Sequence, residues 1–210
     1  FGTTDTTAIE LSDLEGGSGN GFVINGVDSS DQSGISVSGA GDVNGDGLDD
    51  LIVGASIADN LSGSSYVVFG TTDSTAIELS DLEAGIGNGF VINGAGIFDY
   101  SGFSVSGAGD VNGDGYDDLI IGAYAADPNN LSAGASYVVF GTTDTSAIEL
   151  FDLEAGTGNG FVINGVDADD YSGYSVSGAG DVNGDGFDDL IVGAYQADPN
   201  GNIGSGSSYV

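Results

Sequence analysis

The chain has 210 residues, a formal net charge of −33 at pH 7, and no lysine, arginine, histidine or cysteine. Because phosphate recognition depends on basic side chains, this composition excludes nucleic acid binding and electrostatic docking on an anionic membrane surface. Side-chain salt bridges and disulfides are also excluded. The apolar fraction of 40% is sufficient for one core or for part of a larger array. Divalent cations are therefore the expected counter-ions and partners.

The sequence repeats with a period of about 70 residues. The segment Phe-Gly-Thr-Thr-Asp stands at 1–5, 69–73 and 140–144. This period divides the chain into three units, 1–68, 69–139 and 140–210. A repeat of this length favours the blades of a propeller or another repeat array.

Within the first unit, we expect one helical turn in 8–15, where Ser12 and Glu15 have the spacing of a capping box. A glycine-rich turn at 16–21 leads into a first strand at 22–27, with counterparts at 90–94 and 161–166. Further strands are expected at 34–41, 50–55 and 64–70. The fold class predicted is therefore all-β, with three tandem four-stranded antiparallel blades.

The stretch Asp-Val-Asn-Gly-Asp-Gly-x-Asp-Asp-Leu occurs three times, between the second and third expected strands. Its oxygen-bearing side chains stand at positions one, three, five and nine, a glycine stands at six, and the residue at seven offers a backbone carbonyl. This spacing is typical of a calcium loop. The predicted metal ligands are Asp42, Asn44, Asp46, Leu48 and Asp50; Asp110, Asn112, Asp114, Tyr116 and Asp118; and Asp181, Asn183, Asp185, Phe187 and Asp189.

The setting differs from a helix-loop-helix site, because position twelve is Val53, Ile121 or Val192 instead of glutamate. The alternative is that Asn-Gly and Asp-Gly merely form a β-turn, but three complete copies favour calcium. Three bound ions would leave the chain strongly anionic, and stability should fall when they are removed. Loops of modest calcium affinity suit an extracellular or cell-surface location.

The sequence has no methionine, no signal peptide and no run of about 18 apolar residues, so we expect a processed product or a segment of a longer protein, without direct membrane insertion. The repeats differ most at 56–63, 124–134 and 195–206, which are either functional surface loops or plain connectors. Aromatic residues in 98–100 and 170–174 could stack on a glycan or pack between blades. The chain stops at Val210, inside the strand that other repeats spell as Tyr-Val-Val-Phe-Gly.

Catalysis is not expected. Without histidine, cysteine, lysine or arginine, most general-base and nucleophile arrangements are absent. Carboxylate pairs remain at Asp49-Asp50 and at Asp169-Asp170 beside Tyr171, but the first pair recurs in every repeat, which favours a structural task.

Residues 102–123, with the calcium loop followed by Leu-Ile-Ile-Gly-Ala, closely resemble the FG-GAP repeat of integrin alpha-subunit propellers and of bacterial surface proteins. The resemblance covers all three repeats, although Phe-Gly is Ser-Gly here, at 33–34, 101–102 and 172–173. It implies calcium-bound propeller blades and a role in adhesion or recognition, with a protein or glycan ligand. Such propellers have about seven blades. Three blades imply a fragment, two chains completing a six-bladed ring, or a filament; the alternative function is therefore a structural subunit of an extracellular filament or surface layer.

Overall fold

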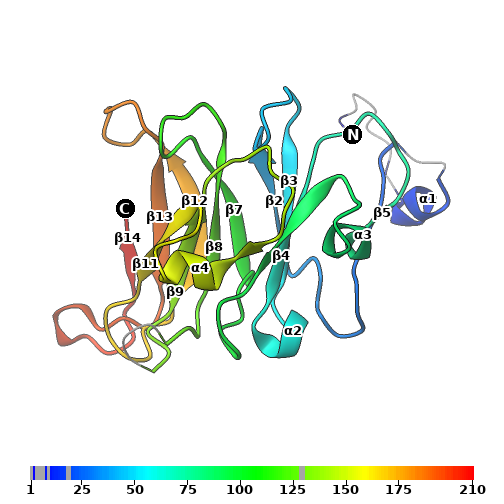
Figure 1. The fold of residues 1–210 in the computed structure, drawn as a ribbon. Helices are drawn as coiled ribbons and strands as arrows, with labels where there is room; N and C mark the ends of the chain where they lie inside the picture. The colour runs from blue at the N-terminus through cyan, green and yellow to red at the C-terminus, as the bar shows by residue number, and fades with distance from the viewer. Residues whose placement is uncertain (1, 3–7, 9, 18–19, 128–130) are drawn as a thin grey trace.

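The computed structural model describes residues 2, 8, 10–17, 20–127 and 131–210. The strands form a row of sheets, with the N-terminal residues at one end of the row and the C-terminus at the other (Figure 1). The start of the chain and residues 128–130 of the second variable loop lie outside the described residues. The all-β prediction is confirmed, because the described helices are short segments of three to five residues and the sheets make up the rest of the regular structure.

Three of the four described sheets are each built mainly from the strands of one repeat. The first has the order β10-β6-β4-β3-β2, the second β11-β9-β8-β7 and the third β12-β13-β14, and all neighbours are antiparallel except β10 and β6. A small parallel pair joins β1 and β5. The strand bounds are β1 Ile24–Asn25, β2 Ser36–Gly41, β3 Asp50–Ala55, β4 Ser64–Val68, β5 Ile77–Glu78, β6 Gly89–Asn93, β7 Ser104–Gly109, β8 Asp118–Ala123, β9 Ala135–Val139, β10 Ile148–Glu149, β11 Gly160–Asn164, β12 Ser172–Gly180, β13 Asp189–Ala194 and β14 Ser207–Tyr209.

The sheets are offset from the sequence repeat, which corrects one expectation. The strand expected to open each blade instead closes the sheet of the preceding repeat: β6 pairs with β4, placing Phe90 opposite Val67, and β11 pairs with β9 in the same way. The glycine at the start of the strand permits this pairing, since a Cβ on Gly89 would lie 1.9 Å from the Val67 carbonyl oxygen. The boundaries 1–68, 69–139 and 140–210 stay a prediction about the sequence repeat.

One-turn helices precede these closing strands. They are α1 Leu11–Glu15, α3 Leu79–Glu83 and α4 Leu150–Glu154, so the expected helical turn is confirmed in each copy, although no side chain caps it. Two further turns lie in the variable loops. They are α2 Ala58–Leu61, which contains the left-handed residues Asp59 and Asn60, and the 3-10 turn η1 Pro199–Gly201.

The core lies between the sheets, so the middle strands are buried on both faces. Every residue of β4, β8 and β9 is buried. The largest apolar cluster joins the first and second sheets through side chains such as Ile52, Phe90, Leu119 and Tyr137. Outer residues of β13 and β14 are more exposed, because these strands lie at the end of the row.

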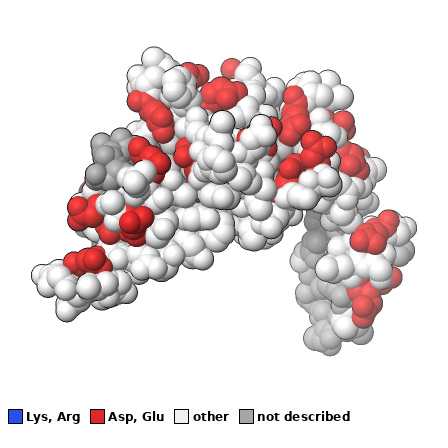
Figure 2. Space-filling view, turned by 90° about the horizontal axis from the view of Figure 1, so that it is seen from below, with Lys and Arg blue, Asp and Glu red and all other residues white. Residues whose placement is uncertain are grey.

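Acidic side chains are spread in separate groups over the face shown in Figure 2, with no basic residue among them. In the described part of the chain, no helix has the length and apolar character needed to cross a membrane.

Candidate metal centre

Each predicted calcium loop connects the first two strands of a sheet: β2 to β3, β7 to β8, and β12 to β13. The glycine at position six has a left-handed backbone in all three copies, with φ of 88° at Gly47, 93° at Gly115 and 95° at Gly186. A side chain is strained in that region, so glycine is what allows the loop to curl.

The polar side chains of the first loop turn inward onto its own backbone. Asp42 accepts hydrogen bonds from the amides of Asp46 and Gly47, both at 2.9 Å. Asn44 Oδ1 accepts from the Asp46 amide at 2.7 Å, and Asp46 Oδ1 accepts from the Leu48 amide at 2.9 Å. The second and third loops repeat these bonds. The side chains at positions one and three therefore accept from the same backbone amide in every copy, and in the first two copies the asparagine also donates to the aspartate at position five, at 3.1 and 2.9 Å.

The aspartate at position nine is buried and ties the loop to the next repeat. Asp50 is 0% exposed; its Oδ2 accepts from the Val43 amide at 2.9 Å and its Oδ1 from the Gly70 amide at 2.7 Å. Asp118 does the same with Val111 and Gly141. Burial raises the pKa of Asp50; the two amide bonds oppose this effect, and the charges of Asp46 and Asp42 raise the pKa further.

The third loop differs at this position. Asp189 is partly buried, and its Oδ2 accepts from the amides of Val182 at 2.8 Å and Asn183 at 3.3 Å. Its Oδ1 accepts a hydrogen bond from the Asn183 side-chain amide at 3.4 Å, whereas the Oδ1 atoms of Asp50 and Asp118 accept from glycine amides. This loop is accordingly the least enclosed of the three.

The loops offer carboxylate and amide oxygens, the ligand type that hard divalent cations prefer. Among the described residues, no three acidic, histidine or cysteine side chains lie close enough to be recognised as a metal site. In the first and second loops, burial and the neighbouring carboxylates raise the pKa of Asp50 and Asp118, and the chain has no basic side chain to compensate these charges. The residues present therefore fit a divalent cation by chemistry and charge.

The side chains at position seven pack on neighbouring glycines. A Cβ on Gly45 would lie 2.5 Å from Tyr116 Cε1, and one on Gly113 would lie 2.6 Å from Phe187 Cε1. Only glycine permits this close approach, so each loop lies directly against the loop of the next repeat.

Sequence reasoning missed the role of the aspartate at position eight. Asp117 Oδ2 accepts from the Asp42 amide at 2.8 Å, and Asp188 Oδ2 accepts from the Asp110 amide at 3.0 Å. Each thus holds the first residue of the preceding loop. The Asp-Asp pair recurs in all three copies, and this recurrence could have indicated a structural role for the aspartate at position eight.

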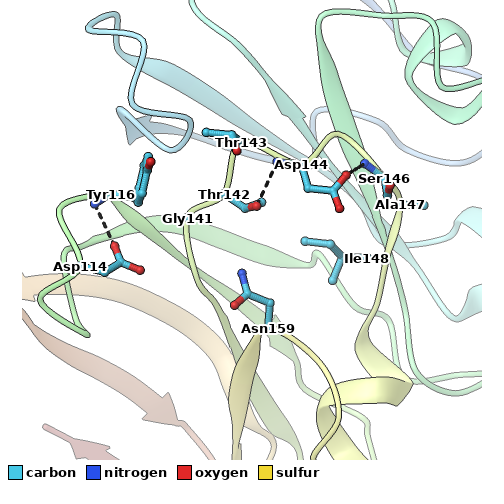
Figure 3. A pocket seen from close by; sticks show the side chains of 10 residues that line it. All are labelled: Asp114, Tyr116, Gly141, Thr142, Thr143, Asp144, Ser146, Ala147, Ile148 and Asn159. Atoms are coloured by element: carbon cyan, nitrogen blue, oxygen red, sulfur yellow. Dashed lines mark hydrogen bonds between the residues drawn. The ribbon is translucent and has the colours of Figure 1, made fainter.

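An open pocket of about 450 Å³ lies between the second loop and residues 141–148. Figure 3 shows Asp114 and Tyr116 on one side and Thr142, Asp144 and Ile148 on the other. Asp114 and Asp144 accept hydrogen bonds from nearby backbone amides, those of Tyr116 and Ser146 respectively. The pocket therefore borders the candidate metal loop.

Tyrosines considered for glycan stacking pack against Tyr124 across the second and third sheets. Tyr124 lies at centroid distances of 6.1 Å from Tyr171 and 5.4 Å from Tyr174, and it also stacks on Tyr100 at 5.4 Å. Tyr124 and Tyr195 begin the variable loops, which follow β8 and β13 and so lie at the opposite strand ends from the candidate metal loops. Packing between sheets is therefore confirmed, and Tyr195 is still 48% exposed.

The chain matches the FG-GAP repeat family over residues 33–68, 101–139 and 172–210. It belongs to this family, and the resemblance inferred from the loops is confirmed. The matches begin at or just before β2, β7 and β12, and each includes one candidate metal loop.

The relatives found by sequence are integrin alpha chains. Integrin alpha pat-2 of Caenorhabditis briggsae is 31% identical over 176 residues, covering 74% of this chain and 13% of the relative. Integrin alpha-IIb of Mus musculus is 29% identical over 167 residues, covering 74% of this chain and 14% of the relative. Integrin alpha ina-1 of Caenorhabditis elegans is 31% identical over 191 residues, covering 82% and 15%. The chain thus spans only a small part of the length of these relatives.

Proposed function

We propose that the protein is a calcium-binding extracellular repeat protein that acts in cell-surface adhesion or recognition. The observation that carries the proposal is the threefold recurrence of one loop in which an asparagine and two aspartates turn their side chains onto the loop backbone, followed in the sequence by an aspartate that is fully buried in the first two copies. A calcium ion in each loop would neutralise charges that no basic side chain of this chain can offset.

In this proposal each ion is held by positions one, three, five, seven and nine of its loop. Asp42, Asn44 and Asp46 supply side-chain oxygens, Leu48 supplies its carbonyl, and Asp50 supplies a carboxylate that already joins the loop to Gly70. Tyr116 and Phe187 take the place of Leu48 in the other two loops. The ion supplies charge neutralisation and cross-linking of the loop, which stabilises the junction between repeats.

The recognition role rests on membership of the FG-GAP family and similarity to integrin alpha chains. An extracellular or cell-surface location, a protein or glycan ligand, and a non-enzymatic role are proposed on the same grounds. Binding of the immobilised chain to purified extracellular proteins and neutral oligosaccharides tests this role, and absence of binding to every ligand in calcium would contradict it. The alternative function is a structural subunit of an extracellular filament or surface layer.

The calcium proposal is tested by thermal unfolding at about millimolar calcium and after chelation. Calcium should raise the melting temperature of the chain. Asp114→Asn removes one ligand charge while keeping the side-chain shape, and should weaken binding at the second loop by at least about tenfold, since even loss of an outer-shell partner costs that much. Asp152→Asn, an exposed aspartate outside the loops, is the matched control. A melting temperature indifferent to calcium would contradict the proposal.

A further inference from the structure

Each candidate metal loop contains an Asn-Gly pair, at 44–45, 112–113 and 183–184. Such a pair can convert without an enzyme, because the amide nitrogen of glycine approaches the asparagine side chain with no Cβ in the way. The segment around the pair, Asp-Val-Asn-Gly-Asp-Gly, is identical in all three copies. Local sequence therefore gives the three pairs the same reactivity, and any difference between them must come from the fold.

The asparagine side chain is prepared for attack in every loop. Asn44 Oδ1 accepts a hydrogen bond from the Asp46 amide at 2.7 Å, and its counterparts accept the same bond at 2.8 Å. A donor at this oxygen draws electrons from Cγ and stabilises the negative charge that the oxygen gains when Cγ is attacked. The electrophile is therefore equivalent in the three copies.

The attacking nitrogen is held in the second and third loops. The Gly113 amide donates to Asp110 Oδ1 at 2.7 Å, and the Gly184 amide donates to Asp181 Oδ1 at 2.6 Å. Hydrogen bonds to an ionised carboxylate are stronger than neutral ones. Each of these bonds must break before the nitrogen can reach the asparagine, so both pairs are protected.

The first loop lacks this protection. Asp42 accepts from the amides of Asp46 and Gly47, both at 2.9 Å, and within the described residues no hydrogen bond holds the Gly45 amide. Gly45 is also exposed. The nitrogen next to Asn44 is therefore free to react.

The difference does not come from a missing neighbour. The first loop is packed against the loop that follows it, since the Asp42 amide donates to Asp117 Oδ2 at 2.8 Å and Tyr116 lies against Gly45. The second loop has the same two contacts, and its glycine amide is still held. The free amide is thus a property of the first loop itself.

We propose that Asn44 is a site of spontaneous deamidation, selected by the fold from three identical sequences. The Gly45 nitrogen forms a bond to Asn44 Cγ, the bond from Cγ to Nδ2 breaks, and Nδ2 leaves as ammonia with the proton of the Gly45 amide. Water then opens the succinimide ring at either carbonyl, leaving aspartate or isoaspartate in place of the asparagine. Either product adds a negative charge to the first loop, and isoaspartate lengthens its backbone by one carbon.

Peptide mass spectrometry tests the selectivity, on chain incubated without calcium at mildly alkaline pH and shown by circular dichroism to stay folded. Asn44 should convert at least about tenfold faster than Asn112 or Asn183, because a hydrogen bond to a charged group is worth that factor or more. In urea the three should convert at equal rates, since their local sequences are identical. An Asn44 that converts no faster than Asn112 in the folded chain would overturn the proposal, whether or not the loops bind calcium.

The cause is tested by removing the protecting carboxylate. Asp110→Ala frees the Gly113 amide and should speed conversion of Asn112 at least about tenfold. Asp42→Ala is the matched control, because it deletes the same position of the first loop without freeing the Gly45 amide, and it should change the rate at Asn44 much less. Equal acceleration in both variants, or none at Asn112, would show that the hydrogen bond does not set the selectivity.

Discussion

At the scale of single residues, aspartate carboxylates hold neighbouring segments together by accepting hydrogen bonds from backbone amides. Asp50 fastens a loop to the next repeat, and Asp117 fastens one loop to another, in both cases through backbone amides. A carboxylate that accepts amide hydrogen bonds gains charge-assisted contacts without a cation partner. Such contacts let a chain without lysine or arginine keep aspartates in and near its core.

At Asp99, burial of an ionised carboxylate lowers the stability of the folded state near neutral pH. Burial raises its pKa from 3.8 to about 6, and the nearby charge of Glu154 adds to the increase. The folded state therefore binds a proton that the unfolded state releases, so the contribution of Asp99 to stability is full below about pH 4 and is lost as the pH rises through about 6.

Asp99→Asn should therefore make the protein more stable than wild type near neutral pH, by about 1 kcal/mol after allowance for solvent screening. The difference should shrink as the pH falls toward 4. Urea unfolding of both proteins across this range measures the effect, with the exposed Asp152→Asn as a control for the loss of one charge. A wild type more stable than Asp99→Asn at neutral pH would contradict the argument.

At the scale of elements, the positions of the strands follow from the sequence, but their partners do not. The apolar run at 50–55 and the alternating run at 34–41 correspond to β3 and to β2 at 36–41. The calcium loop was predicted from its spacing alone and stays a prediction; the structure shows that its side chains bond to the loop backbone. The closing strand was assigned to the wrong sheet, because a periodic sequence fixes the order of strands and leaves open where each blade begins.

The helices show how burial depends on the neighbouring repeat. The sequences of α1 and α3 are both Leu-Ser-Asp-Leu-Glu, yet only α3 is buried. Local sequence therefore determines the helical turn, and packing on the sheet of the preceding repeat determines its contribution to stability.

Leu150→Ala should lower the free energy of unfolding by about 2–5 kcal/mol, because Leu150 is 0% exposed in the main cluster and its loss leaves a cavity. Leu11→Ala is the matched control in an equivalent helix, and should change the stability of the chain by no more than about 0.5 kcal/mol. Denaturant unfolding at low protein concentration compares the two. Equal losses for both variants would show that the helices do not differ as described.

At the scale of the whole molecule, the three sheets form a stack held by apolar clusters and by contacts between successive loops. Each sheet depends on the repeat that follows it, which makes the array directional. Calcium in the loops would strengthen the same junctions, since Asp50 and Asp118 join the loops to the following repeat.

The most direct test of this account is calorimetric titration of the metal-free chain with calcium, at about millimolar final concentration. The account predicts three ions per chain and a weaker third site, because Asp189 is less enclosed than Asp50 or Asp118. Asp46→Asn, Asp114→Asn and Asp185→Asn should each weaken one site. A chain that binds no calcium in this range, or whose binding is unchanged in all three variants, would contradict the assignment of the loops as metal sites.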